Sequence, residues 1–126
     1  MKKAILSPNA PKAIGPYSQA VSAGGFVFLS GQVPVDPLTG NLVEGAVAVQ
    51  AARVFENLKA VLASGGLDFS HVVKTTVYLC DMSDFAEVNE VYARYFNEPY
   101  PARATVAVAA LPRGARIEVD AIAIVR

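Results

Sequence analysis

Two amphipathic helical patterns, set between short apolar segments, constrain this chain more than any other feature. Between residues 45 and 64, and again between 84 and 96, apolar side chains recur every three or four positions, which is the period of one helix face. The first set comprises Val47, Ala51, Val54, Phe55, Leu58, Val61 and Leu62. The second set comprises Phe85, Val88, Val91, Tyr92, Tyr95 and Phe96. We therefore predict two helices, each with one buried face.

Six other segments have the β-branched and aromatic composition of strands. They span residues 2–7, 17–23, 26–32, 70–80, 102–110 and 115–125. The last of them has few polar residues on either side, which is typical of a strand in the middle of a sheet. The order of these elements predicts an α+β fold with both helices on one face of the sheet.

Glycine and proline mark the turns between these elements. Gly24-Gly25 is predicted to form a hairpin turn, and Asp36-Pro37-Leu38-Thr39-Gly40 a turn in which Pro presets φ and Gly is free to adopt a positive φ. Gly65-Gly66 is predicted to end the first helix, because Gly accepts the left-handed conformation found there. Asp84 and Glu87 have the spacing of a capping box for the second helix.

A chain of 126 residues is predicted to form a single domain, spanning 1–126. It carries 11 Lys and Arg against 11 Asp and Glu, so no basic excess favours nucleic acid as a partner. Charged residues make up only 17% of the chain, against about 25% in an average domain. This shortage of charge suggests that part of the surface is covered, most simply by other copies of the chain.

The lengths of the apolar runs and the cysteine content indicate in which cellular compartment the protein resides. The longest unbroken apolar run, 106–111, is far shorter than the roughly 20 residues that span a bilayer. The apolar stretch at 4–6 is too short for a signal peptide. A single cysteine, Cys80, allows no intrachain disulfide. We therefore expect a cytoplasmic protein with no membrane partner.

The histidine and cysteine content offers little for metal or thiol chemistry. One His and one Cys do not make a zinc-type ligand set, so no metal is expected. His71 and Cys80 lie near opposite ends of one predicted strand, about 30 Å apart and too far for a nucleophile and its base. Cys80 is predicted to be a buried or half-buried apolar residue, and His71 a surface or capping residue. The chain has no phosphate-binding loop of the Walker or G-x-G-x-x-G type.

Arg103 and Glu118 are the first candidates for chemistry. Arg103 opens an apolar strand, and its planar fork can hold a carboxylate through two parallel hydrogen bonds. Glu118 lies in an otherwise apolar strand, where a carboxylate can orient or deprotonate water. From composition alone the structural explanations are favoured, namely an ion pair at a strand end for Arg103 and a solvent-facing position for Glu118.

A geometric argument links these two residues. If the last two strands form a hairpin, Glu118 lies opposite Ala109, on the same sheet face as Arg103 but on the order of 20 Å away along the strand. One small substrate cannot touch both side chains within one chain at that distance. If both are functional, they should meet across a subunit boundary, which agrees with the low fraction of charged residues.

Four further residues are candidates for a binding site. Tyr17 lies at the exit of a stiff loop, and Ser30-Gly31 ends an apolar strand, where a glycine lets a ligand approach the backbone. A packed tyrosine and an ordinary strand-ending turn explain these positions equally well. Asn89 lies within the apolar side of the second helix, either as a buried hydrogen-bond partner or as a site residue.

Together these segments resemble the RidA family of reactive imine deaminases, formerly the YjgF group. The matching motifs are Ile14-Gly-Pro-Tyr-Ser-Gln-Ala20, Ser30-Gly-Gln-Val-Pro-Val-Asp-Pro-Leu-Thr-Gly40, Val88-Asn-Glu-Val-Tyr92 with Tyr95-Phe96, and Pro101-Ala-Arg-Ala-Thr-Val106 through Leu111-Pro112 to Ile117-Glu118-Val119. They occur in the order and at the spacing of the family and cover essentially the whole chain. The segment from Pro-Ala-Arg to Ile-Glu is the most specific of them.

The resemblance implies a chorismate-mutase-like fold, a mixed β-sheet with two helices packed on one face, assembled as a homotrimer with sites between subunits. It implies hydrolysis of 2-imino acids or their enamine tautomers, such as 2-iminobutanoate and 2-iminopropanoate, to 2-keto acids and ammonia, with no cofactor. By the same resemblance, Arg103 holds the substrate carboxylate and Glu118 positions the attacking water. Tyr17, Ser30, Gly31 and Asn89 match positions that line the family's cleft.

Thr105 departs from the family pattern, because many members carry cysteine there. The family mainly uses the backbone carbonyl of that residue, so Thr105 is compatible with activity, whereas thiol-dependent behaviour is not carried over. Two other functions stay open. One is a regulatory trimer that binds small carboxylates without turnover, and the other is a ribonuclease or translation inhibitor, against which the zero net charge and the lack of a catalytic histidine pair count.

Overall fold

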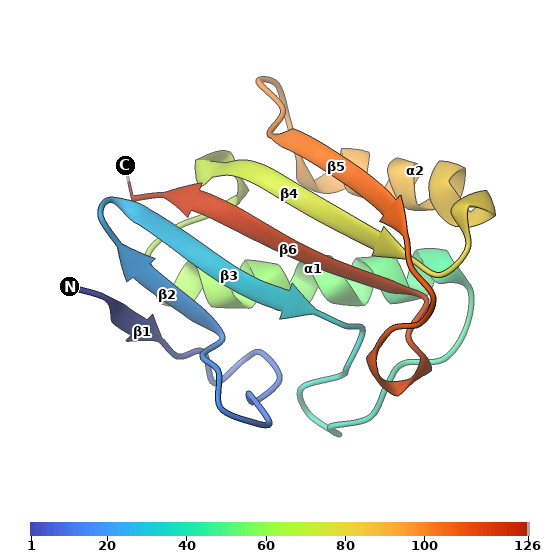
Figure 1. The fold of residues 1–126 in the computed structure, drawn as a ribbon, viewed down its shortest axis with the longest axis horizontal. Helices are drawn as coiled ribbons and strands as arrows, with labels where there is room; N and C mark the ends of the chain where they lie inside the picture. Colours follow the sequence, from blue (N-terminus) through green and yellow to red (C-terminus); the bar gives the residue numbers. More distant parts are fainter. Residues whose placement is uncertain (126) are drawn as a thin grey trace.

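The computed structural model describes residues 1–125, which form one six-stranded sheet with two helices. The elements are β1 (Lys3–Ile5), β2 (Ala20–Ala23), β3 (Phe26–Gln32), α1 (Val47–Ser64), β4 (Val72–Leu79), α2 (Phe85–Tyr95), β5 (Ala102–Ala107) and β6 (Ile117–Ile124). The strand order is β1-β2-β3-β6-β4-β5, and only the β4–β5 pair is parallel. Both helices lie on the same side of the sheet and leave its other face open (Figure 1). The predicted α+β fold with a mixed sheet is therefore confirmed.

Strand β6 occupies the middle of the sheet, as its apolar composition predicts. It pairs antiparallel with β3 on one side and with β4 on the other. Its side chains alternate between buried and half-buried along the whole strand. Ile117 and Val119 are fully buried on the helix side, whereas Glu118 and Asp120 point to the open face.

The hairpin supposed between the last two strands does not form. Strand β5 pairs with β4, in parallel, and both edges of β6 are already occupied by β3 and β4. The succession β4–α2–β5 is a strand–helix–strand unit, whose crossover helix brings the second strand back parallel to the first. The nine residues between Ala107 and Ile117 then carry the chain across the end of β4 to the centre of the sheet.

The predicted glycine turns are present. Gly24 and Gly25 have φ angles of 59° and 85° and connect the paired residues Ala23 and Phe26, which is a two-residue hairpin of type I′. Gly66 has a φ of 75°, and its N–H donates to the carbonyl of Ala63 at the end of α1. These turns fix where β3 and β4 begin.

The predicted capping box at the start of α2 is wrong. Asp84 makes no side-chain cap, and the turn before the helix is capped by Asp81 instead. The Asp84 carboxylate pairs with the guanidinium of Arg116 at 2.9 Å, so a partner 32 residues away along the chain takes the place of the local cap. This ion pair ties the start of α2 to the segment that leads into β6.

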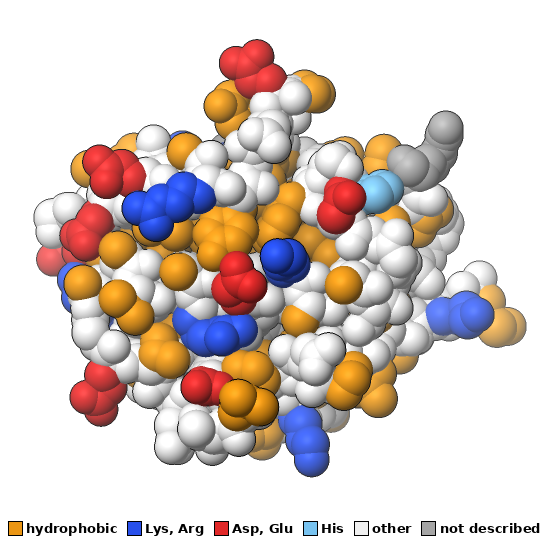
Figure 2. Space-filling view, turned by 180° about the vertical axis from the view of Figure 1, so that it is seen from behind, with side chains coloured by type: hydrophobic (Ala, Val, Ile, Leu, Met, Phe, Trp, Pro, Cys, Tyr) orange, Lys and Arg blue, Asp and Glu red, His pale blue; other side chains and the backbone are white. Residues whose placement is uncertain are grey.

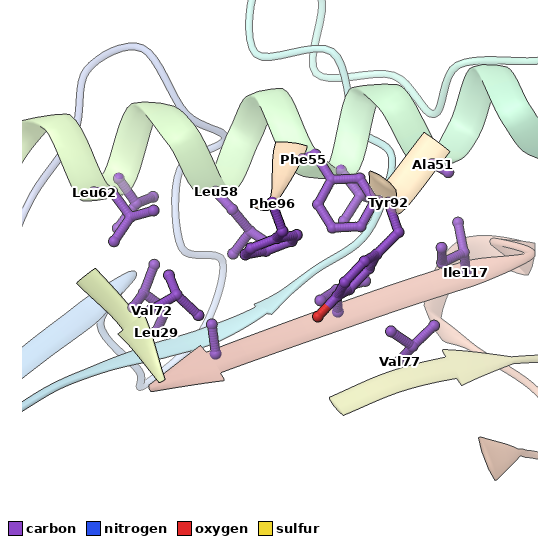
Figure 3. Close-up of a cluster of buried hydrophobic side chains, with 14 of the residues drawn as sticks. Leu29, Ala51, Phe55, Leu58, Leu62, Val72, Val77, Tyr92, Phe96 and Ile117 are labelled. Carbon is purple, nitrogen blue, oxygen red and sulfur yellow. The ribbon is translucent and has the colours of Figure 1, made fainter. Parts of the chain in front are cut away.

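The core lies between the helices and the sheet, and its centre is aromatic (Figure 3). The Phe55 ring of α1 lies with its centroid 5.7 Å from Tyr92 and 6.0 Å from Phe96, both edge-on, and 5.0 Å from Tyr95, stacked. Tyr92 and Phe96 stack at 4.4 Å. These contacts hold α2 against α1 and fix the rings that α2 presents to β4 and β5.

The helix side of the molecule carries acidic and basic side chains interspersed among apolar ones, and neither sign dominates it (Figure 2). Within residues 1–125, no helix is long and apolar enough to cross a membrane. The same residues contain no group of three or more His, Cys, Asp or Glu side chains that could hold a metal ion.

The single histidine and the single cysteine have different surroundings from one another. His71 takes part in a capping box with Asp68, which confirms its predicted capping role. Cys80 is exposed, so its predicted burial is wrong. It follows the last residue of β4, where the chain leaves the sheet, and its thiol donates to the carbonyl of Ala115 at 3.3 Å.

Candidate active site

A cavity of about 680 Å³ lies beside the C-terminal end of β3 and contains four of the predicted site residues. These are Tyr17, Ser30, Gly31 and Glu118. Its other walls come from the loop between β1 and β2, the loop after β3 and the loop before β6, with Lys12, Gln32, Val33, Val35, Pro112 and Arg113 among the lining residues. The cavity is therefore built where three loops meet the open face of the sheet.

Glu118 reaches this cavity because β6 presents it on the open face, opposite Tyr78 of β4. Its carboxylate lies directly over Gly31. A Cβ added to Gly31 would overlap with Glu118 Oε2 and would lie only 2.9 Å from Cδ and 3.1 Å from Cγ. Gly31 is therefore the residue that leaves room for the carboxylate, which gives a physical reason for a glycine at this position.

The surroundings of Glu118 raise the pKa of its carboxyl group above the ordinary value. Desolvation by burial is the largest cause, and the like charge of Asp120 on the same face adds to it. Asp120 accepts a hydrogen bond from the Tyr78 hydroxyl at 3.0 Å, which in turn raises the pKa of Tyr78. A half-buried carboxylate with a raised pKa is a better proton acceptor than a solvated one.

Ser30 and Tyr17 line the same cavity as Glu118. The pairing of β3 with β6 shifts register between Leu29 and Gln32, and this bulge turns Ser30 and Gly31 toward the cavity. The Ser30 hydroxyl donates to the carbonyl of Ser18 at 2.6 Å, which ties β3 to the loop between β1 and β2. Tyr17 lies on that loop and is 53% exposed, so it is not a packed core tyrosine.

Sequence reasoning missed Arg113, which lines the cavity from the loop before β6. Its φ of 61° is positive, which is unusual for a residue other than glycine. Its guanidinium donates to the carbonyl of Gly40 at 2.9 Å and so joins two loops of the cavity wall. The Pro-Arg-Gly sequence indicates a turn at this place, but it gives no sign of a contact 73 residues away.

The second group of candidate residues lies elsewhere, at the β5 edge of the sheet. Arg103 pairs in register with Thr75 of β4, and its side chain lies on the helix side, beside α2. Its Nη1 donates to Oδ1 of Asn89 at 2.7 Å. Asn89 is exposed, so the alternative of a buried hydrogen-bond partner is wrong, and its amide oxygen instead meets the arginine.

Thr105 lies two residues beyond Arg103 on the same edge strand. The N–H of Val108 donates to Leu79 of β4 at 2.8 Å, so by the alternation of a strand the even-numbered residues of β5 face β4. The backbone N–H and carbonyl groups of Arg103 and Thr105 therefore point outward from the free edge of the sheet.

The structure thus divides the candidates into two separate groups. Arg103 is aligned with Thr75 and Glu118 with Tyr78, three residues apart on β4, and the two side chains lie on opposite faces of the sheet. The expectation that they share a face is wrong, because it rested on the hairpin. Strand spacings put their Cα atoms on the order of 14 Å apart. Within one chain they still cannot hold one small molecule between them, now because the sheet itself separates them.

Fold and site together define a class of small α+β domain, with one helix-covered sheet, an arginine fork at its free edge and a glutamate-lined cavity on its open side. The chain belongs to the RidA/YjgF family. The model of this family, described as "Endoribonuclease L-PSP", matches residues 7–125.

Curated relatives and solved structures agree with this membership. The chain is 65% identical over 98% of its length to the protein DfrA of Myxococcus xanthus, of which 95% is covered. It is 52% identical, over 98% of its length and 92% of the relative, to the 2-iminobutanoate/2-iminopropanoate deaminase of Mus musculus. The structure of E. coli TdcF with bound serine superposes with a TM-score of 0.92 at 44% identity, over 98% of this chain and 99% of that one.

Proposed function

We propose that this protein hydrolyses short 2-imino acids, such as 2-iminobutanoate and 2-iminopropanoate, to the corresponding 2-keto acids and ammonia. The observation that carries the proposal is the half-buried Glu118 carboxylate, which lies over Gly31 in a cavity large enough for a small substrate and a water molecule. Relatives named as deaminases of these two imino acids, at about half identity over nearly the whole chain, support the substrate class. The serine bound to a solved relative supports a small ligand that carries a carboxylate.

The chemistry requires few groups, because the imine carbon is already electrophilic. Arg103 binds the substrate carboxylate through its planar fork and so orients the C=N bond. Glu118 accepts a proton from the attacking water as the water oxygen bonds to the imine carbon, and the π electrons of the C=N bond move to the nitrogen. Glu118 passes this proton to the nitrogen, which gives a carbinolamine. The hydroxyl proton of the carbinolamine then follows to the nitrogen by the same carboxylate, the carbon–nitrogen bond breaks, ammonia leaves and the 2-keto acid remains. No cofactor takes part in this proposal.

In this proposal one active site is shared between two copies of the chain, which assemble as a homotrimer. Arg103, Asn89 and the outward backbone groups of Thr105 come from one copy, and the Glu118 cavity with Tyr17, Ser30 and Gly31 comes from the next. The two half-sites are different surfaces of the same chain, so the contact between copies is heterologous. In a closed ring, each copy contributes one surface to the site on one side and the other surface to the site on its other side. The cytoplasm is the compartment we propose, because the single thiol forms no intrachain disulfide.

A semicarbazide competition assay tests the activity. An amino-acid oxidase or a threonine dehydratase generates the imino acid, and semicarbazide traps what the protein does not hydrolyse. We expect less semicarbazone with the wild-type protein. We expect restored trapping with Arg103→Ala and a loss of kcat of about 10²- to 10⁴-fold with Glu118→Gln.

The matched control is Arg94→Ala, since Arg94 is an exposed arginine on α2. This variant should hydrolyse the imino acid as fast as the wild type. Lack of hydrolysis of several imino acids by the wild type, with 2-keto acids still bound, would contradict the enzyme proposal and favour a regulatory trimer that binds carboxylates.

RNA cleavage is the second candidate, because the matching family model is described as an endoribonuclease. The balanced charge gives little support for it, since nucleic-acid binding depends on cationic side chains that neutralise phosphates. Incubation of a labelled RNA with wild type and with Arg103→Ala/Glu118→Gln decides the matter. Cleavage by the wild type alone would assign the same cavity to RNA.

A further inference from the structure

We propose that Tyr92 is a positioning residue for Arg103, and that its ring, together with Phe85 and Asn89, holds the guanidinium in one orientation before any ligand arrives. The Arg103 Cζ atom lies 4.7 Å from the centroid of Tyr92 and 5.4 Å from that of Phe85. Both distances are within the range of a cation–π contact. Arg103 is exposed, so without these contacts its long side chain would sample several rotamers.

Tyr92 is suited to this role because it is itself immobilised by the core. It is only 6% exposed, and its hydroxyl, which points toward the sheet, lies 2.7 Å from the Thr75 hydroxyl (Figure 3). Its ring stacks on Phe96 and meets Phe55 edge-on. Since Thr75 is also the residue aligned with Arg103 on β4, one pair of strands fixes both the ring and the arginine above it.

Asn89 restricts the motion that the rings leave open to the guanidinium, which is rotation within its own plane. Asn89 Oδ1 accepts one hydrogen bond from Nη1. A guanidinium has five N–H donors, so four remain, and two parallel ones are enough for a carboxylate. The two rings pack against the guanidinium and Asn89 accepts from one of its N–H groups, so the remaining N–H donors are available to a carboxylate.

The expected kinetic effect follows from when the contacts are made. They exist in the free protein and in every bound state, so their loss weakens carboxylate binding without a specific effect on the chemical step. Tyr92→Leu, which removes the ring, should raise KM about 3- to 10-fold and leave kcat within about 2-fold. Tyr92→Phe keeps the ring and should leave KM within about 2-fold of wild type.

The direct test is the mobility of the Arg103 side chain, which does not depend on turnover. The Nε–Hε signal of Arg103 is identified by its absence in Arg103→Lys, and its ¹⁵N relaxation is compared with that of Arg94, an exposed arginine on α2. We expect Arg103 to be markedly more rigid than Arg94 in the wild type, to remain so in Tyr92→Phe, and to become mobile in Tyr92→Leu. Tyr95→Leu is the matched control, because Tyr95 lies on the same helix and stacks on Phe55.

The outcomes separate this proposal from the function on which its kinetic part rests. A wild-type Arg103 as mobile as Arg94 overturns the positioning role, whether or not the imines are hydrolysed. A rigid Arg103 that loosens in Tyr92→Leu upholds the role even if the wild type shows no deaminase activity. Should Tyr92→Leu fail to fold, Tyr92→Met replaces it, because it also removes the ring but keeps a longer apolar side chain in the core, and an unchanged Arg103 signal in that variant overturns the role.

Discussion

At the scale of single residues, the contact between Gly31 and Glu118 is the tightest in the candidate site. An added methyl group at Gly31 would occupy the space of the carboxylate, and its backbone φ is not in the left-handed region. Gly31→Ala should therefore displace Glu118 without backbone strain. We expect kcat to fall about 10- to 100-fold, as for a catalytic group moved by about an ångström, in steady-state assays with a generated imine.

A double-mutant cycle shows whether the effect of Gly31→Ala passes through Glu118. In a Glu118→Ala background the methyl group meets no carboxylate, so Gly31→Ala should change the melting temperature less than it does in the wild type. Equal changes in the two backgrounds would show that the methyl group is tolerated, or resisted, for another reason.

Asp120 gives a prediction about pH. Protonated Glu118 cannot accept a proton, so kcat/KM should fall as the pH falls through the raised pKa of Glu118. Asp120→Asn removes the like charge while an amide oxygen still accepts from Tyr78, so the acid limb of the profile should move to lower pH. The move should be partial, because desolvation is the larger cause of the raised pKa. An acid limb that stays in place would show that Glu118 is not the group that titrates.

Because its pKa is raised in the folded protein, ionised Glu118 lowers the free energy of unfolding. The folded protein binds this proton more tightly than the unfolded chain does. The free energy of unfolding should therefore decrease as pH rises through the interval between the ordinary and the raised pKa, with the full cost present above it. Glu118→Gln should then raise the melting temperature at pH 7, and the gain should vanish in acid, below the ordinary carboxyl value. Thermal unfolding at several pH values measures this, and a gain that is independent of pH would contradict it.

At the scale of elements, helix α1 supports the cavity wall through a buried amide. Asn57 is fully buried, and its Nδ2 donates to the carbonyls of Val33 and Val35, at 3.3 and 2.9 Å, in the segment that lines the cavity after β3. Asn57→Ala leaves both carbonyls without this donor. We expect a loss of about 2 kcal/mol in the free energy of unfolding, measured by urea denaturation. Lys59→Ala, an exposed position on the same helix, should lose little, and equal losses would contradict the anchoring role.

The elements themselves could be predicted because their signals are local. The period of apolar residues located α1 and α2 to within a few residues, and the Gly24-Gly25 turn located the hairpin between β2 and β3. The errors came from contacts between distant segments. The capping-box spacing predicts a local cap at Asp84, whereas the partner of its carboxylate is Arg116. Sequence order favours pairing of β5 with β6, whereas β5 pairs with β4. The strand–helix–strand order was the signal that could have corrected the pairing.

The candidate site could be predicted only in part, again because contacts between distant segments decide its geometry. Residue types were enough to single out Arg103, Glu118 and Gly31, since each is unusual for its place in a strand. Their faces and separation depend on the register of β6 against β4 and β5, which no local pattern encodes. A one-residue change of register would move every side chain to the other face.

At the scale of the whole molecule, the open face of the sheet combines apolar surface with one of the two groups of candidate residues. Phe26 and Phe28 lie on this face, 44% and 46% exposed, with ring centroids 6.2 Å apart. Glu118 and Asp120 lie on the same face of β6. Large exposed aromatic side chains are typical of surfaces that bind another protein. A second copy covering this face would both remove them from water and bring an Arg103 edge within reach of a cavity.

Mixing two inactive variants tests this shared site. Arg103→Ala keeps an intact cavity and Glu118→Gln keeps an intact arginine fork, so a mixed assembly restores some sites that contain both groups. Random exchange of copies should restore about one site in four, and hence about a quarter of wild-type activity, after co-refolding or slow exchange.

The control for the mixing experiment is Arg103→Ala combined with the double variant Arg103→Ala/Glu118→Gln, which never brings an intact Arg103 to any site and should stay inactive. Activity in the first mixture and not in the second requires that Arg103 and Glu118 act from different copies. Absence of any recovery, in mixtures shown by mass spectrometry to contain both variants, would mean that each chain acts alone. One chain would then have to supply both side chains, although the sheet separates them, and the argument for a ring with shared sites would fail.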